Sequence, residues 1–289
     1  MKRVTWLLAL MGAVLLSASP VPADELFVVV GGRPAVGTKI TSLPYEIKTS
    51  GYYYLTGNLT YTGGNGITVS ANDVTLDLMG FVLTGSGSNA GNYSGILLTS
   101  DKSNVEVRNG TVSNWWSGVE QYNSSTGTNH RVIGIRANGN TYGVWLGGSN
   151  HLIKGCTATP GTFGSSTGLR ITGTGTISDS TVRGFTTGIY IGGGKVSGNV
   201  VLNCPGKGIN AFGPATISHN SVSNCGAGTG NAGIFSAGGS FIGNAIVANT
   251  GQTCVASSNV LVPDQNSLSG DGTPKGVISY LLGGVNGGW

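Results

Sequence analysis

Apolar and polar residues alternate along most of this chain in short runs, and the runs recur at nearly constant spacing. A glycine followed by an aliphatic residue heads each run, and successive pairs lie 20 to 29 residues apart. The eight pairs are Gly66-Ile67, Gly95-Ile96, Gly118-Val119, Gly143-Val144, Gly168-Leu169, Gly188-Ile189, Gly208-Ile209 and Gly233-Ile234. Alternation with a period of two predicts short β-strands, because a helix would repeat near every 3.6 residues.

A second set of apolar residues keeps step with the first. Its members are Leu76, Val107, Val132, Ile153, Ile177, Val196, Ile217 and Phe241. Each unit therefore holds several short strands separated by Gly, Asn and Ser turns. One unit cannot bury its apolar face alone, but stacked units form a continuous core. We predict an all-β parallel β-helix solenoid of about eight coils.

The N-terminus predicts export. Lys2 and Arg3 precede an uncharged run from Trp6 to Leu16, and small residues at 21–23 offer a cleavage site. This is the pattern of a signal peptide, and its apolar run is short for a membrane span. We expect a cleaved signal peptide at 1–23, a lead-in and N-terminal cap at 24–65, coils at 66–250 and a C-terminal cap or tail at 251–289. The exported protein is predicted to be extracellular, on the cell surface or periplasmic, and not membrane-spanning.

Charge excludes some partners. Only 9% of the residues are charged, and removal of Lys2 and Arg3 leaves 13 basic against 11 acidic side chains. Nucleic acid and anionic lipid call for clustered basic residues, so neither is expected as a partner. No Cys or His spacing suggests a metal site, and we predict no cofactor.

Residues 44–85 (PYEIKTSGYYYLTGNLTYTGGNGITVSANDVTLDLMGFVLTG) add a family resemblance. They resemble the opening of bacterial secreted right-handed parallel β-helix repeat proteins with the pectin-lyase-like fold, and the likeness extends over about residues 44 to 250. The resemblance implies a right-handed solenoid. It does not imply an activity, because lyases, hydrolases, epimerases and non-catalytic binding proteins share this fold. One departure is Met79, where such proteins often carry asparagine.

The residue two positions after each repeat glycine has aliphatic neighbours, so alternation points it outward. These residues are Thr68, Leu97, Glu120, Trp145, Arg170, Tyr190, Asn210 and Phe235. The three aromatic members recur every second coil, about 10 Å apart at the spacing of stacked strands. Rings at this spacing suit stacking on an extended glycan, with Glu120, Arg170 and Asn210 bonding hydroxyls between them. An oligomer interface or an ordinary strand surface is also compatible with exposed aromatic residues.

Catalysis has weaker support. Glycoside hydrolysis uses two carboxylates across one bond, and the 11 acidic residues include no Asp-Asp pair. We assign no catalytic residue. The weak candidates are Glu120 and Arg170, which lie two coils apart on either side of Trp145.

Stacking also gives structural explanations to several polar residues. Asn199, Asn220 and Asn244 align in three coils and predict a buried amide ladder, with Met79 and Cys156 among its earlier positions. Asp77 with Arg108, and Glu106 with Arg131, are predicted as surface ion pairs. His130 and His151 align in adjacent coils and are expected to be structural.

Two cysteines align as well. Cys204 and Cys225 follow the same asparagine of their motif in neighbouring coils, so the spacing predicts a disulfide between them. Cys156 is expected to be a buried free thiol, and no partner is assigned to Cys254.

The leading functional hypothesis is an exported, non-catalytic protein that binds extracellular or envelope polysaccharide through the outward aromatic column. The alternatives are a polysaccharide lyase or glycoside hydrolase with an atypical site, and a structural surface protein that self-assembles as a homo-oligomer.

Overall fold

The computed structural model describes residues 27–30, 33–87, 91–121, 126–161, 166–227, 231–248, 255–257, 260–261 and 267–270. The predicted signal peptide and Cys254 lie outside these residues. The chain divides into two compact units at residue 37. In the first unit, β1 (Phe27–Val30) and β2 (Arg33–Val36) form an antiparallel pair.

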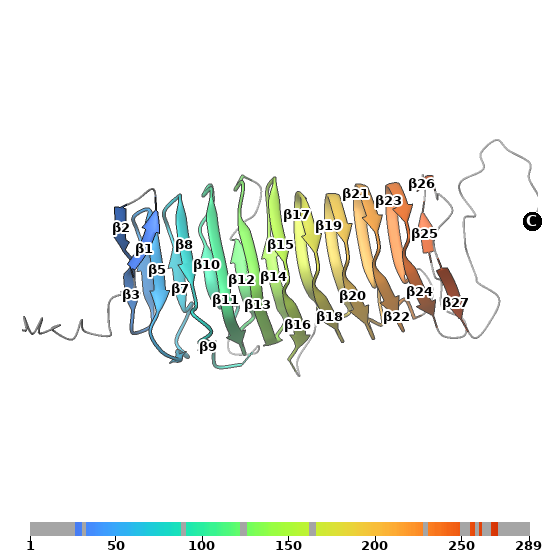
Figure 1. The fold of residues 1–289 in the computed structure, drawn as a ribbon. Coiled ribbons are helices and arrows are strands. Elements are labelled where there is room, and N and C mark those ends of the chain that lie inside the picture. Colours follow the sequence, from blue (N-terminus) through green and yellow to red (C-terminus); the bar gives the residue numbers. More distant parts are fainter. Residues whose placement is uncertain are drawn as a thin grey trace, which may run out of the picture. The chain divides into compact units, whose positions relative to one another are not determined.

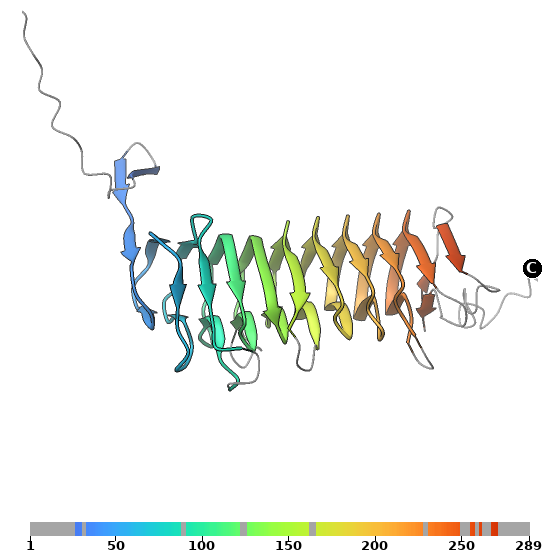
Figure 2. The ribbon, with the colours of Figure 1, turned by 90° about the horizontal axis from the view of Figure 1, so that it is seen from below.

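The second unit is a single sheet of 25 strands in which the pairs are parallel and coil stacks beside coil (Figures 1 and 2). Each coil contributes to three faces, which we call A, B and C. Face A contains β4 (Tyr45–Ile47), β7 (Ile67–Val69), β10 (Ser94–Leu98), β12 (Ser117–Gln121), β14 (Tyr142–Leu146), the first parts of β17 (Thr167–Ser178), β19 (Thr187–Ser197), β21 (Ile209–Ser218) and β23 (Ile234–Ile242), and β25 (Val255–Ser257).

Faces B and C complete the coils. Face B contains β3 (Thr38–Ile40), β5 (Gly51–Leu55), β8 (Val74–Asp77), the first parts of β11 (Val105–Ser113) and β13 (Arg131–Asn140), β15 (His151–Lys154), the second parts of β17, β19, β21 and β23, and β26 (Val260–Leu261). Face C contains β6 (Leu59–Thr60), β9 (Val82–Thr84), the second parts of β11 and β13, β16 (Thr157–Pro160), β18 (Thr181–Arg183), β20 (Val200–Leu202), β22 (Ser221–Ser223), β24 (Ala245–Ala248) and β27 (Ser267–Gly270).

The solenoid has about eight turns, as predicted, but its strands reach beyond the predicted coil boundaries. Parallel pairing begins at Thr38, inside the segment expected to be lead-in and cap. It continues through β27 to Gly270, inside the segment expected to be the C-terminal tail. The coiled region therefore extends on both sides of 66–250.

Both apolar columns of the sequence point into the core. Ile96, Val119 and Val144 pair across face A and are fully buried, and Val107, Val132 and Ile153 do the same on face B. Each fully buried aliphatic side chain contributes about 1.5–3 kcal/mol relative to an exposed one. The repeated column is therefore the main source of stability in a chain with few charges.

The repeat glycines are required by contact between coils. A Cβ atom built on Gly143 would lie 2.3 Å from the carbonyl oxygen of Gly168, the glycine of the next coil. On Gly208 it would lie 2.4 Å from the carbonyl oxygen of Gly233. Any larger residue would push the coils apart. Glycine is therefore required at these positions by the close approach of two backbones, and not by an unusual φ angle.

The amide ladder is present in the last coils. Asn199 Nδ2 donates to Asn220 Oδ1 at 3.0 Å, and Asn220 Nδ2 donates to Asn244 Oδ1 at 2.9 Å. All three side chains are buried. The expected place of Met79 in this ladder is wrong: strand pairing puts Phe81 opposite Gly110, because Val82 pairs with Thr111. Met79 instead lies in a turn with φ of 52° and is 42% exposed.

Cys204 and Cys225 lie in one column, as predicted, but both are buried free thiols and the expected disulfide is not formed in the structure. The sulfur of Cys225 accepts the backbone N–H of Cys204 at 3.3 Å, so it is directed at the backbone of the neighbouring coil. Strand stacking sets the distance between the two Cα atoms, but it does not supply the side-chain dihedral angles that a disulfide needs. Cys156 is a buried free thiol, as expected, and burial raises its pKa to about 11.

Candidate functional site

The predicted outward column exists on face A. Strand register pairs Thr68 with Leu97, and the column then continues residue by residue through Glu120, Trp145, Arg170, Tyr190 and Asn210 to Phe235. All of these side chains are partly exposed, whereas their aliphatic neighbours in each strand are buried. We call this set the face A column. Its alignment follows from the parallel stacking of coils.

Arg170 occupies the centre of the column between two aromatic rings. Its guanidinium carbon lies 4.5 Å from the ring centroid of Trp145 and 4.9 Å from that of Tyr190. Both distances are within the range of a cation–π contact. A planar guanidinium held on both faces has little freedom to turn, so its orientation on the surface is fixed by its two neighbours.

The column has flanking residues that the sequence pattern did not single out. The ring of Tyr142 lies 4.9 Å from that of Trp145 and 5.7 Å from that of Trp116. The Lys207 ammonium lies 4.4 Å from the Phe235 ring centroid. Tyr142 and Lys207 each directly precede a repeat glycine. This shared position in the repeat is the feature of the sequence that could have indicated that both lie beside the column.

A further aromatic side chain extends this surface. Phe212 lies two residues beyond Asn210 in β21 and is 67% exposed, the largest exposure among the described large apolar residues. The register between β19 and β21 shifts directly after the Ile191–Ala211 pair, so Phe212 lies at an irregularity of the sheet.

Several polar atoms of the column have no partner within the described residues. Trp145 Nε1, Arg170 Nε and Asn210 Oδ1 are buried and form no hydrogen bond. Only two other described side-chain atoms, Gln121 Nε2 and His130 Nε2, share that condition. Buried polar groups without partners are rare in native structures and mark strained or functional places.

Glu120 lies towards the N-terminal end of the column. It accepts a hydrogen bond of 2.5 Å from the hydroxyl of Ser94, which is itself buried. Burial raises the pKa of Glu120, and the Ser94 hydrogen bond opposes that rise. Trp145 lies between Glu120 and Arg170 in the register, so the structure does not join the two weak catalytic candidates in an ion pair.

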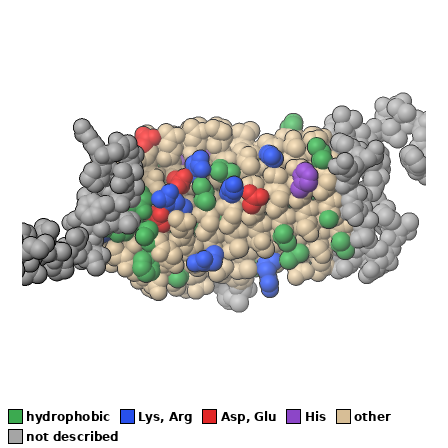
Figure 3. Space-filling model, viewed as in Figure 1, with side chains coloured by type: hydrophobic (Ala, Val, Ile, Leu, Met, Phe, Trp, Pro, Cys, Tyr) green, Lys and Arg blue, Asp and Glu red, His purple; other side chains and the backbone are tan. Residues whose placement is uncertain are grey.

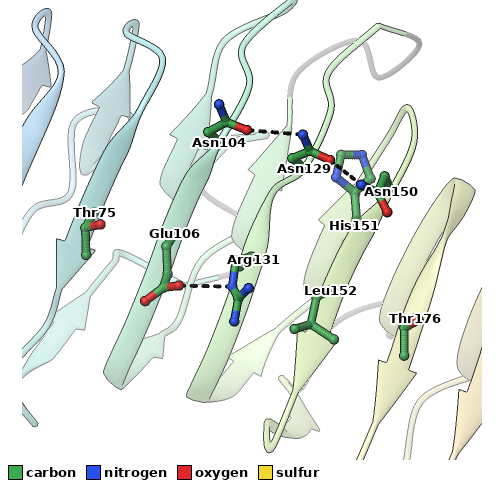
Figure 4. A pocket seen from close by; sticks show the side chains of 9 residues that line it. All are labelled: Thr75, Asn104, Glu106, Asn129, Arg131, Asn150, His151, Leu152 and Thr176. Carbon is green, nitrogen blue, oxygen red and sulfur yellow. Dashed lines mark hydrogen bonds and ion pairs between the residues drawn. The ribbon is translucent and has the colours of Figure 1, made fainter.

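Face B carries a different, polar surface. Figure 3 shows acidic and basic side chains gathered over one part of the solenoid. A shallow hollow of about 590 Å³ opens on face B and is lined by Thr75, Asn104, Glu106, Asn129, Arg131, Asn150, His151, Leu152 and Thr176 (Figure 4). The turn asparagines form a row, in which Asn129 Nδ2 donates to Asn104 Oδ1 at 3.2 Å and Asn150 Nδ2 donates to Asn129 Oδ1.

The two predicted ion pairs beside this hollow join into one network. Arg108 contacts Asp77 at 2.7 Å and Glu106 at 3.0 Å, and Glu106 also contacts Arg131 at 3.1 Å. The expectation that both pairs are surface pairs was wrong for Asp77, which is only 3% exposed. Tyr52 donates a hydrogen bond to Asp77 at 3.4 Å, and the side chains around the carboxylate cover it.

His130 and His151 are stacked and buried beside the hollow, which His151 lines. Their ring centroids are 5.1 Å apart and nearly parallel, at 4°. Nδ1 of His151 accepts the backbone N–H of His130, and Nδ1 of His130 accepts that of Val105. Both rings therefore use Nδ1 as an acceptor and carry their proton on Nε2. Burial, and then the neighbouring His151, lower the pKa of His130 to about 3, and burial lowers the pKa of His151.

Acid is expected to destabilise the fold through these histidines. Their unfolded pKa is near 6.5 and their folded pKa is lower, so the unfolded chain binds more protons as pH falls below about 6.5. For His130, whose folded pKa is about 3, the suppressed protonation costs about 1.4 kcal/mol per pH unit between those two values. Urea unfolding at pH 7, 6 and 5 measures the slope.

The His130→Val variant should flatten this slope, because valine already occupies the same column at Val74 and Val105. His219→Asn is the control, since His219 is exposed and its φ of 55° suits asparagine. An unchanged slope in His130→Val would contradict the assignment of acid sensitivity to this residue.

Comparisons with known proteins support the fold. No protein-family model and no curated protein sequence matches the chain. Among solved structures, the Dettilon tailspike protein matches with a TM-score of 0.61 at 14% identity, over 81% of this chain and 61% of that one. The chain therefore spans less than two thirds of that tailspike's length. Pectate lyase Pel9A matches with a TM-score of 0.43 at 17% identity, over 74% of this chain and 70% of that one.

The architecture and the likeness to the tailspike define the fold of this chain. It is an all-β, right-handed parallel β-helix solenoid of about eight turns. Within the described residues, no helix is long and apolar enough to cross a membrane.

Proposed function

We propose that this protein is a non-catalytic, exported β-helix protein that binds polysaccharide along the face A column. The observation that carries the proposal is the continuous stack of Trp145, Arg170 and Tyr190 on an outward strand face. Aromatic rings and planar polar groups are the groups that contact sugar faces and hydroxyls. A tailspike and a pectate lyase among the similar structures are consistent with a polysaccharide ligand.

The periodicity of the column suits an extended polymer. Trp145, Tyr190 and Phe235 lie in every second coil, so neighbouring members are about 10 Å apart along the axis. Asn210 lies between Tyr190 and Phe235, as Arg170 lies between Trp145 and Tyr190. An aromatic position therefore alternates with a polar position over five consecutive coils. A small ligand would use only part of this length.

The carboxylates of face A argue against glycoside hydrolysis. Glu120 lies in the face A column, and Glu46 lies on the same register one coil before Thr68, so Thr68 and Leu97 separate the two carboxylates. Three strand spacings separate the two, about 14 Å. Hydrolysis uses carboxylates about 5 to 9.5 Å apart, so this pair is too widely spaced.

Trp145→Ala is expected to abolish retention of polysaccharide while the solenoid stays folded. Trp145 is partly exposed and its loss removes the contacts with Tyr142 and Arg170 on the surface rather than a core contact. The measurement is retention of the purified protein on a panel of immobilised polysaccharides, with thermal unfolding to verify the fold. Val200→Ala is the control, because Val200 is a 37% exposed apolar residue on face C.

Three outcomes of this experiment contradict the proposal. Retention equal to wild type in Trp145→Ala would exclude the column as the binding surface. Release of reducing or unsaturated ends from the panel would favour an enzyme instead. A molecular mass that rises with concentration, and falls in Trp145→Ala, would favour self-assembly through the same aromatic surface.

A further inference from the structure

We infer that the polysaccharide bound on face A is acidic, with Arg170 and Lys207 binding its anionic groups. This inference rests on the proposed function and adds the chemical class of the ligand. It starts from a difference between Arg170 and the arginines of face B. Arg108 and Arg131 are each bonded to carboxylates at 2.7 to 3.1 Å. Within the described residues, Arg170 has no acidic partner and lies between two rings.

The orientation of Arg170 leaves its outer edge available. Its Nε atom is buried and without a partner among the described residues, so the inner edge of the guanidinium is closed to solvent. The two rings cover its flat faces at 4.5 and 4.9 Å. The terminal nitrogens form no hydrogen bond to any described residue, and the side chain remains partly exposed. A guanidinium presented edge-on in this way matches a carboxylate or sulfate by paired hydrogen bonds.

Lys207 repeats the arrangement further along the column. Its ammonium lies against the Phe235 ring at 4.4 Å and has no acidic partner within the described chain. Lys207 lies two residues before β21, the strand of Asn210, and its ammonium lies over Phe235, three coils from Arg170. The two cations are thus two to three strand spacings apart, about 10 to 14 Å along the axis, each held on an aromatic ring. This spacing fits a polymer that carries an anionic group at regular intervals.

The nearest acid on this face does not neutralise the cations. Glu120 is bonded to the Ser94 hydroxyl, and Trp145 separates it from Arg170 in the register. The middle and C-terminal part of the column therefore presents positive charge beside aromatic rings. A neutral polysaccharide would leave both cations without a counter-charge, at a cost that grows as the ligand displaces water.

Single-stranded nucleic acid also combines rings with negative charge, but the surface suits it less well. Affinity for a phosphate backbone grows with the number of cations that contact it. Among the described residues, the face A column and its flanking residues offer two cations for this purpose, Arg170 and Lys207. We therefore assign the anionic groups to an acidic polysaccharide, and nucleic acid becomes a control in the test.

The test uses the full protein on alginate, polygalacturonate, hyaluronan and chondroitin sulfate, with dextran and single-stranded DNA as controls. The acidic polymer that binds best is then compared with its carboxyl-reduced or desulfated form. We expect at least tenfold weaker binding after removal of the charge, and weaker binding at higher salt. This comparison changes only the ligand, so it does not depend on the folding of any variant.

Variants then assign the charge to its residue. Arg170→Gln should weaken binding of the acidic polymer about tenfold or more, and Arg170→Lys should restore part of it, because charged hydrogen bonds are the stronger ones. Arg183→Gln is the matched control, since Arg183 is exposed on face C. Its binding should equal wild type.

The outcomes separate this inference from the proposed function. Equal binding of charged and uncharged polymers, with loss in Trp145→Ala, would overturn the acidic ligand and leave polysaccharide binding intact. Wild-type affinity in Arg170→Gln would overturn the role of Arg170. DNA binding as tight as that of the best polysaccharide, or retention of none of the acidic polymers, would overturn the inference. Acidic-polymer binding that survives Trp145→Ala would contradict the proposed site itself.

Discussion

Gly143→Ala is expected to destabilise the solenoid by about 3 kcal/mol or more. The added methyl group would lie 2.3 Å from the Gly168 carbonyl oxygen and 3.0 Å from the Ala158 Cβ atom. One obstacle is backbone of the next coil, and the other is a buried core residue, so neither moves out of the way easily. Overpacking of a core costs about 1–3 kcal/mol and exceeds this where backbone must shift. The free energy of unfolding, from urea titration, measures the loss.

Gly57→Ala is the matched control for this prediction. A Cβ atom built on Gly57 meets nothing within 4 Å, and the residue lies in the same solenoid. We expect its stability to stay within about 0.5 kcal/mol of wild type, as for most surface substitutions. Equal stability of the two alanine variants would show that close approach between coils does not explain the glycine column.

The sequence predicts the fold well because coil stacking couples each position to its equivalent in the next coil. At six repeat glycines a Cβ atom would lie 2.3 to 2.8 Å from the carbonyl oxygen of the next repeat glycine, and a buried aliphatic residue follows each of them: Gly66, Gly118, Gly143, Gly168, Gly188 and Gly208. The amino-acid pattern alone therefore predicts the register of the column from Thr68 to Phe235. It does not predict the coils at 38–60, because Tyr45 and Ile47 alternate without a preceding glycine.

What the sequence does not predict is the arrangement of side chains within a column. Alternation makes Asp77 outward, yet Tyr52 and Arg108 cover it and it is buried. Stacking places Cys204 beside Cys225 but leaves their sulfur atoms free to bond with backbone groups. The position of Arg170 between two rings likewise depends on side-chain rotamers, and the spacing of residues along the sequence does not predict rotamers.

The buried amide ladder gives the second large effect, through hydrogen bonding rather than shape. Asn220 Oδ1 accepts both the backbone N–H and the side-chain amide of Asn199, each at 3.0 Å. Asn220 Nδ2 donates to the Val196 carbonyl at 3.0 Å and to Asn244 Oδ1 at 2.9 Å. Asn220→Ala removes all four bonds at once. It leaves the backbone N–H of Asn199, which is 1% exposed, without this acceptor.

An unsatisfied buried donor costs about 1–3 kcal/mol, and the cavity left by the amide adds to this cost. We therefore expect Asn220→Ala to lower the free energy of unfolding by about 3 kcal/mol. Asn138→Ala is the control, because Asn138 lies on an outward strand position and its side chain accepts a hydrogen bond from Thr159 at 3.1 Å. Its loss should stay below about 1 kcal/mol. Urea unfolding compares the two variants. If both variants lose little stability, and by the same amount, the ladder is only a consequence of stacking. A much larger loss of stability in Asn220→Ala means that the amides hold successive coils together.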